Sequence, residues 1–388
     1  MKNVLVWGIG GLVVISGLVF YGTGISGGNP FTAAVGGLFT NSDTIRVGAA
    51  LGLTGVCAQW GEGELQAVQL AVDETNTNGG IEGRQIELFV EDTQCDPKGA
   101  VSAMKKLTEV NSVEAIIGLT WGDSFQAGHF VNQEKQILAV APSAAMEALL
   151  LNKIPITHTF STWFPVQTQI DTLQAYMRKT GRTNIVVVHD QDPYGKMLAT
   201  VFVSNAQKNE LVIMSEEEFP IGFDDFRTTI IKLKNTKPDA VFGAFQSPDL
   251  KAKFLKQSHE LGLKVQLFSS EDIQDEGILK EFGSVMEGVI YTYPTASGNF
   301  EELFEKLKQK HGAVPAGASV ANAYDATHVV IHALTEHYRN GTSLNGAVEG
   351  MAIPGTAVKE IRFNETHQIT GTVFQVKTVR NGEFVVIE

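Results

Sequence analysis

Short apolar runs alternate with amphipathic stretches from residue 45 onward. Ile45–Leu53 is typical of a buried strand, and Gly63–Asn76 places its apolar residues on one face of a helix. Asp96-Pro97 is typical of a helix start, because Asp caps the first turn and Pro fits its first position. The same patterns predict strands at Gln85–Glu91, Val113–Leu119 and Ile137–Ala141, and helices from Asp96 to Val110 and over Ser124–Gln136.

A second series of alternating elements begins near residue 160. Its predicted strands are Asn184–His189, Leu211–Phe219, Ala240–Phe245, Val265–Ser269 and Gly288–Tyr293. Its predicted helices are Phe164–Thr180, Tyr194–Lys208, Asp225–Lys234 and Pro248–Leu261, followed by two long helices, Asn299–His311 and Ala318–Tyr338, expected to return to the first domain. Arg380-Asn381-Gly382 predicts the turn of a closing β-hairpin, because Asn-Gly suits a two-residue hairpin loop.

This alternation predicts an α/β fold with two doubly wound parallel-sheet lobes. Gly79, Gly80 and Gly83 fit the left-handed turns expected between a helix and the next strand. In open sheets of this kind, ligands bind outside the carboxyl ends of the strands. The loops at those ends are therefore the expected site.

Composition narrows the function classes. The 388 residues are 43% hydrophobic and 19% charged, which is typical of a globular protein large enough for two domains. The net charge of −13 argues against nonspecific nucleic-acid binding, which needs clustered basic residues.

The N-terminus differs from the rest. Lys2 precedes an apolar stretch from Val4 to Tyr21, whose length lies between a signal-peptide core and a spanning helix. We favour an uncleaved signal anchor with Lys2 inside; a cleaved signal peptide is the alternative. Residues 22–43, rich in Gly, Ser and Thr, are expected to form a flexible tether.

The chain has two cysteines, Cys57 and Cys95. In an exported protein such a pair indicates one disulfide, and both residues lie in predicted loops after strands of one sheet. Two buried free thiols are the alternative.

Several short stretches, in order, resemble the branched-chain-amino-acid type of periplasmic binding protein, the type I substrate-binding proteins of ABC importers. They are Leu53-Thr54-Gly55 with Gln59-Trp60-Gly61, Asn78 to Gly83, Asp92 to Lys98, Ile117-Gly118, Ala141-Pro142-Ser143-Ala144, and His189-Asp190 with Tyr194-Gly195. The resemblance covers roughly residues 44 to 388.

The resemblance implies two lobes that close around a ligand through three crossovers. We place the crossovers near residues 160–162, 291–293 and 363–365. Lobe 1 then comprises 44–161 and 293–364, lobe 2 comprises 162–292 and 365–388, and 1–43 precede both.

The resemblance also implies site residues. In the first lobe, Gly122, Ser143, Ala144 and Ala145 match the positions that hold a ligand carboxylate, although Gly122 and Ala145 replace the usual Ser and Thr. Backbone N–H groups there could still hold an anion at a helix N-terminus. Asp123 either lines the site or, as we favour, caps the next helix.

In the second lobe, Glu271 occupies the position of the acid that binds a ligand ammonium, with Asp272 as the neighbouring alternative. Tyr194 and Trp60 match family aromatics, and Gln246 stands where Tyr is common. Trp121 either walls the pocket or packs in the core.

Catalysis is not predicted. His189-Asp190 resembles a catalytic pair but matches a strand-end motif of the family, and no nucleotide-binding glycine motif is present. His328 and His332 have metal-compatible spacing, yet a structural role is the simpler interpretation, and no cofactor or metal is expected.

The sequence therefore predicts a monomeric extracytoplasmic binding protein that captures an amino acid or related zwitterion for the membrane permease of an ABC importer. The alternative is a sensor of the same fold that reports to a receptor.

Overall fold

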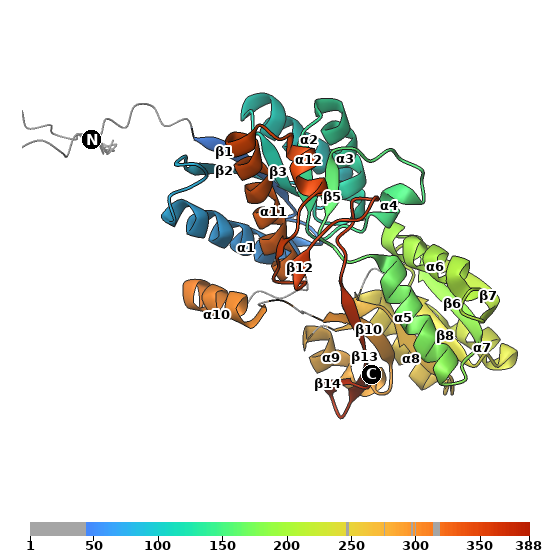
Figure 1. Cartoon of the computed structure of the whole chain (residues 1–388). Helices are drawn as coiled ribbons and strands as arrows, with labels where there is room; N and C mark the ends of the chain where they lie inside the picture. Colours follow the sequence, from blue (N-terminus) through green and yellow to red (C-terminus); the bar gives the residue numbers. More distant parts are fainter. Residues whose placement is uncertain (1–43, 246–247, 275, 296–297, 299, 313–318) are drawn as a thin grey trace, which may run out of the picture. The chain divides into compact units, whose positions relative to one another are not determined.

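The computed structural model describes residues 44–245, 248–274, 276–295, 298, 300–312 and 319–388. These residues belong to one compact unit, built on two large sheets with helices on both faces (Figure 1). The predicted signal segment and tether, residues 1–43, lie outside the described residues. Within the part that is described, no helix combines the length and apolar character needed to cross a bilayer.

The first sheet has five parallel strands in the order β2-β1-β3-β4-β5. Its strands are β1 (Ile45–Leu51), β2 (Ile86–Asp92), β3 (Ala115–Gly118), β4 (Leu138–Ala141) and β5 (Thr159–Ser161). One face is covered by α1 (Ala58–Thr77), α10 (Phe300–His311), α11 (Ser319–Asn340) and α12 (Leu344–Glu349), and the other by α2 (Pro97–Lys105), its π-helical extension Lys106–Val110, and α3 (Gly122–Lys135). The short helix α4 (Glu147–Leu150) follows β4.

The second sheet has seven strands in the order β14-β13-β10-β9-β8-β6-β7. Its strands are β6 (Asn184–Asp190), β7 (Val212–Phe219), β8 (Ala240–Ala244), β9 (Gln266–Ser269), β10 (Ile290–Thr295), β13 (Val373–Arg380) and β14 (Glu383–Val386). Helices α5 (Val166–Lys179) and α6 (Pro193–Ala206) pack on one face, and α7 (Arg227–Thr236), α8 (Pro248–Glu260) and α9 (Glu276–Met286) on the other. A separate two-stranded sheet joins β11 (Ile353–Pro354) to β12 (Glu360–Ile361).

Strand alternation explains how each sheet buries both faces. In β6, Ile185 and Val187 join the core beneath α5 and α6, while Val186 and Val188 join the core beneath α7 and α8. Successive side chains of a strand point to opposite faces, so an unbroken apolar run is buried on both. The α/β class and the parallel doubly wound sheets predicted from such runs are confirmed.

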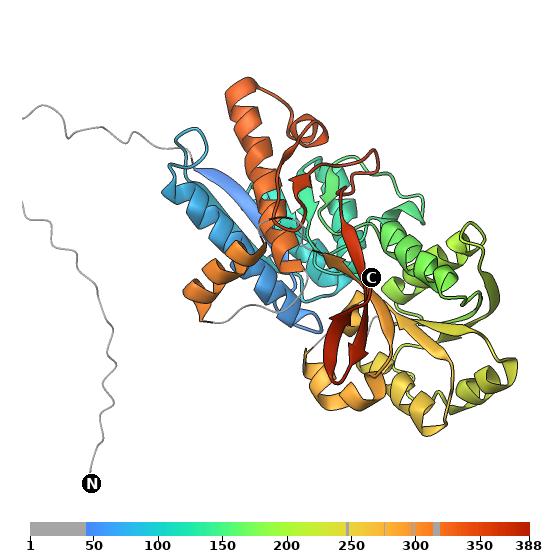
Figure 2. The same ribbon diagram turned by 60° about the horizontal axis from the view of Figure 1, so that its bottom comes forward.

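Two details differ from the prediction. The second sheet is mixed, because the C-terminal hairpin adds β13 antiparallel to β10. Figure 2 shows this hairpin, in dark red, at the edge of the sheet. Its turn has positive φ at Asn381 and Gly382, as the Asn-Gly pair predicted.

Helix α1 begins at Ala58 rather than at Gly63. Gly61 and Gly63 are poor helix formers, so the sequence pattern did not predict this first turn as helical. A Cβ on Gly61 would lie 2.1 Å from the carbonyl oxygen of Gly52, so the helix can approach the end of β1 only without a side chain there. Glycine therefore positions the first turn of α1, which carries Gln59 and Trp60.

Candidate functional site

A cavity of about 540 Å³ lies where the carboxyl ends of strands from both sheets meet. Its walls come from the loops and helix starts that follow β1, β3, β4 and β5 of the first sheet and β6, β7, β8 and β9 of the second. The lining residues include Trp60, Trp121, Ser143, Trp163, Tyr194 and Glu271. This is the location that the strand order of open α/β sheets predicts.

The first sheet presents a helix N-terminus and an unpartnered hydroxyl. Gly122 opens the 14-residue helix α3, and a Cβ on it would meet open space. Ser143 follows β4 and is 6% exposed, and its Oγ lies near the Glu64 carboxyl without completing a hydrogen bond to any described residue. Free N–H groups and a hydroxyl at a helix start suit an anion.

The second sheet presents a buried carboxyl. Glu271 follows β9, is 3% exposed, and accepts hydrogen bonds from Tyr194 Oη and Gln169 Nε2. Burial raises the pKa of Glu271 to about 7, and the charge of Asp272 adds to the rise, while the two hydrogen bonds oppose it. A nearby ammonium would stabilise the charged form of Glu271, so this carboxyl can bind a cation.

Asp272 also lines the cavity, but it already has a cationic partner. Its carboxylate pairs with Lys251, and both side chains are almost fully buried. Ser270 Oγ donates a further hydrogen bond to it at 2.7 Å. This pairing leaves Glu271 as the better partner for a ligand cation.

The end of β6 and the start of α6 each contribute a further carboxylate. Asp192 caps the helix by accepting from the Tyr194 N–H at 2.9 Å, and burial raises its pKa. Asp190 ends β6, and a Cβ on Gly195 would lie 2.0 Å from its Oδ1. Gly195 is therefore required for α6 to start against the end of β6, which sets the position of Tyr194.

A disulfide secures the loop between β1 and α1. Cys57, the residue before α1, is joined to Cys95 with a Cα–Cα distance of 5.9 Å. Asp92 Oδ1 accepts from the Leu53 N–H at 2.9 Å in the same loop. Both contacts fix the segment that leads to Trp60.

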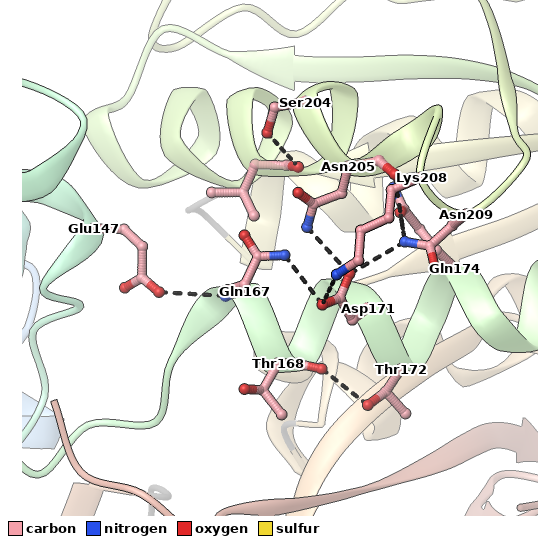
Figure 3. Close-up of polar contacts among 11 residues, drawn as sticks. Glu147, Gln167, Thr168, Asp171, Thr172, Gln174, Ser204, Asn205, Lys208 and Asn209 are labelled. Carbon is pink, nitrogen blue, oxygen red and sulfur yellow. Dashed lines mark hydrogen bonds and ion pairs between the residues drawn. The ribbon is translucent and has the colours of Figure 1, made fainter. Parts of the chain in front are cut away.

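Polar contacts between α5 and α6 support the opposite wall (Figure 3). Asp171 of α5 accepts from Gln167 Nε2 at 3.2 Å and from Asn205 Nδ2 and Asn209 Nδ2 on the α6 side at 3.3 and 3.1 Å. Lys208 Nζ adds an ion pair at 3.4 Å. These contacts tie together the helices that carry Gln169 and Tyr194, the two donors to Glu271.

Most residues singled out from the sequence line this cavity: Trp60, Trp121, Gly122, Ser143, Ala144, Ala145, Tyr194 and Glu271. Gln246 lies outside the described residues. Asp123 is not among the lining residues, and its predicted role as N-cap is wrong, because the cap position is Trp121 and no side chain caps the helix. Asp123 lies instead in the first turn, where burial raises its pKa.

Sequence reasoning missed Trp163, Asp192, Met197, Lys253 and other wall residues. Trp163 lies two residues after the end of β5, so its place near a strand end was the available signal. His189, the residue with catalytic appearance, contacts Glu216 at 3.1 Å and the backbone of Asp190. Across the described residues, no group of three His, Cys, Asp or Glu side chains is placed to hold a metal ion.

Comparison with known proteins decides the family. The model of the family described as periplasmic binding protein matches residues 44–383. The chain belongs to the periplasmic binding protein family. Members of this family are extracytoplasmic proteins that bind ligands and are not enzymes.

Among its periplasmic relatives, the leucine-, isoleucine-, valine-, threonine- and alanine-binding protein of Pseudomonas aeruginosa is 25% identical over 355 residues, covering 89% of this chain and 90% of the relative. The Leu/Ile/Val-binding protein of Escherichia coli K12 is 26% identical, covering 74% and 77%. The solved structure of the substrate-binding protein LivJ of Streptococcus pneumoniae with isoleucine aligns with a TM-score of 0.75 at 22% identity, covering 89% and 99%.

Proposed function

We propose that this protein is the extracytoplasmic substrate-binding component of an ABC importer and captures an amino acid or related zwitterion. The observation that carries the proposal is Glu271, a buried carboxyl held by Tyr194 and Gln169 at the cavity wall. A charge-assisted pair with the ligand ammonium would form there. The names of the relatives, which are amino-acid-binding proteins, support the same ligand class.

On this proposal the ligand bridges the two walls. Its carboxylate binds at the start of α3 and Ser143, while its ammonium binds Glu271. Trp60, Trp121 and Tyr194 enclose the rest, and a small number of polar groups in an apolar wall is usual for small-ligand sites. Residues 44–161 with 293–364 form one lobe and 162–292 with 365–388 the other, and the lobes close by bending near 160–162, 291–293 and 363–365.

The same proposal covers delivery. A loaded binding protein passes its ligand to a membrane permease, and residues 4–21 hold or export the chain outside the cytoplasm. The protein acts as a monomer and needs no cofactor.

A thermal-shift screen tests the ligand class. A ligand that binds only the folded chain raises the melting temperature by an amount set by RT ln(1 + [L]/Kd). We expect zwitterionic amino acids to give the largest shifts and dicarboxylates and amides to give none. A shift with acids or amides alone would keep the family and refute the zwitterion.

A further inference from the structure

Every tryptophan between residues 44 and 388 lines this one cavity. The chain has four tryptophans, Trp7, Trp60, Trp121 and Trp163, and the last three all lie in the cavity wall. The Trp60 ring centroid lies 6.3 Å from that of Trp121 at an interplanar angle of 83°, and 6.2 Å from that of Trp163 at 36°. The three indoles thus form one continuous surface, here called the tryptophan wall.

Trp121 stands on a backbone that favours glycine. Its φ of 70° and ψ of 153° fall in a region that side chains with a Cβ rarely adopt. Leu119, two residues earlier, also has a positive φ of 72°. Such backbone strain is concentrated at functional sites, where the surrounding structure imposes an unfavourable conformation because it positions a functional side chain.

The indole of Trp121 also has an unused donor. Its Nε1 is buried and makes no hydrogen bond to any described residue. Ser143 Oγ lies on the same side of the cavity, near the Glu64 carboxyl. Buried donors are normally satisfied, so the Trp121 indole N–H indicates a polar group supplied from outside the chain.

We propose that the ligand is a zwitterion with an aromatic side chain, which lies against the tryptophan wall, and that Trp121 determines this specificity. This inference rests on the proposed function, since Glu271 and the start of α3 hold the amino-acid portion. Aromatic rings gain energy from offset or edge-to-face contact with each other beyond the gain from burial alone. A branched aliphatic side chain gains only from burial.

The ring arrangement argues against a cage for a quaternary ammonium. Cation–π recognition needs several ring faces directed at one point. The Trp60 and Trp163 rings are inclined by only 36°, so among the three indoles only Trp121, at 83° to Trp60, presents a face in another direction. On the proposed function, Glu271 already binds the ligand ammonium. A cavity of about 540 Å³ also accommodates a ring in addition to the amino-acid portion.

The test is a calorimetric titration of the full-length chain carrying Trp7→Phe with phenylalanine, leucine and choline. In this variant every remaining tryptophan belongs to the tryptophan wall, so a change in indole fluorescence also reports ligand binding at the cavity. We expect phenylalanine to bind roughly 3- to 10-fold tighter than leucine, the range that one aromatic contact provides. Phenylalanine should also change the tryptophan emission more than leucine does.

Trp121→Gly separates specificity from folding, because Gly accepts the φ of this position. We expect the variant to keep its melting temperature and to bind phenylalanine and leucine equally. The matched control is Phe130→Ala, an exposed aromatic on α3 outside the cavity, which should keep the preference. If Trp121→Gly fails to fold, Trp60→Leu provides the second test of the wall.

Leucine binding as tightly as phenylalanine would overturn this inference and leave the proposed function intact. A preference that survives Trp121→Gly in the folded variant, or survives Trp60→Leu where Trp121→Gly does not fold, would overturn it as well, and so would tighter binding of choline. If neither amino acid binds, this inference is refuted, and the thermal-shift screen decides separately whether another zwitterion binds.

Discussion

The two large sheets share one strand order but bring different chemistry to the cavity. The first runs β2-β1-β3-β4-β5, and the parallel part of the second runs β7-β6-β8-β9-β10, so each places its first strand between its second and third. Each therefore has its switch point between its first and third strands, where ligands bind in such folds. The first sheet contributes indoles, backbone N–H groups and a hydroxyl, while the polar side chains from the second are four carboxylates, Tyr194 and Lys253.

This comparison indicates that the loops, not the strand order, determine the chemistry of the cavity. The same topology places the start of a helix at the cavity from both sides, α3 from one and α6 from the other. At α3 the first turn is left open, whereas at α6 it is capped by Asp192. One helix start is thus suited to an anion, and the other is already satisfied.

The largest expected effect concerns the disulfide that secures the loop between β1 and α1, which leads to Trp60 in the cavity wall. Replacing Cys57 and Cys95 together by Ser removes a cross-link between residues 38 apart in sequence. Loop-closure entropy predicts that the free energy of unfolding falls by about 4 kcal/mol. Chemical denaturation of the variant and the parent measures the loss, and adding reductant to the variant serves as the control because it should change nothing further. Equal stability of variant and parent would show that the wall does not depend on the cross-link.

A second prediction compares two buried carboxyls, Glu64 beside the first sheet and Glu271 beside the second. Burial raises the pKa of each to about 7 from a usual value of 4.5. The folded chain therefore keeps protons that the unfolded chain has lost, and stability falls as pH rises from 4.5 to 7. Glu64 should account for about 3 kcal/mol of the fall. Glu64→Gln or Glu271→Gln should each remove the part of the fall that belongs to the replaced residue.

Ligand should distinguish the two carboxyls. A bound ammonium stabilises the Glu271 carboxylate, so saturation with an amino acid should abolish the part of the pH dependence that Glu271→Gln removes and leave the Glu64 part. Denaturant unfolding between pH 4.5 and 7, with and without ligand, measures both parts. An unchanged pH profile in the presence of ligand would contradict the role of Glu271.

The smallest expected effect concerns the polar contacts that join α5 to α6, the helices that carry Gln169 and Tyr194. Asp171→Ala removes the acceptor that joins α5 to Asn205 and Asn209 (Figure 3). Because Asp171 is partly exposed, we expect a loss of about 1 kcal/mol in unfolding free energy. Thr172→Ala, on the same helix, is the matched control and should cost less, since its hydroxyl bonds only within α5. An affinity loss larger than the stability loss would mean that Asp171 acts directly on the site.

The sequence pattern predicted the helices and strands better than it predicted the residues that line the cavity. Strands buried on both faces, such as β6, appear as continuous apolar runs, and Asp96 caps α2 as its Asp-Pro start indicated. The start of α1 was missed because Gly61 and Gly63 resemble a loop until their packing is seen. The Lys251–Asp272 pair was missed because a contact between a helix and the segment after another strand leaves no local period. Trp163 was missed because its only signal was its place near the end of β5.

The start of α3 and Ser143, on the side of the first sheet, are proposed to bind the ligand carboxylate, while Glu271, on the side of the second sheet, binds the ammonium of the same ligand. The most direct test is calorimetric titration at pH 7 with phenylalanine and its deaminated acid, in the parent chain and in Glu271→Gln. Truncating one partner of a buried charge pair costs about 2–5 kcal/mol, so phenylalanine should bind Glu271→Gln at least about 30-fold more weakly. The exposed Glu281→Gln serves as the control. In the parent chain the deaminated acid should bind far more weakly than phenylalanine; equal affinity of the two compounds would contradict the account.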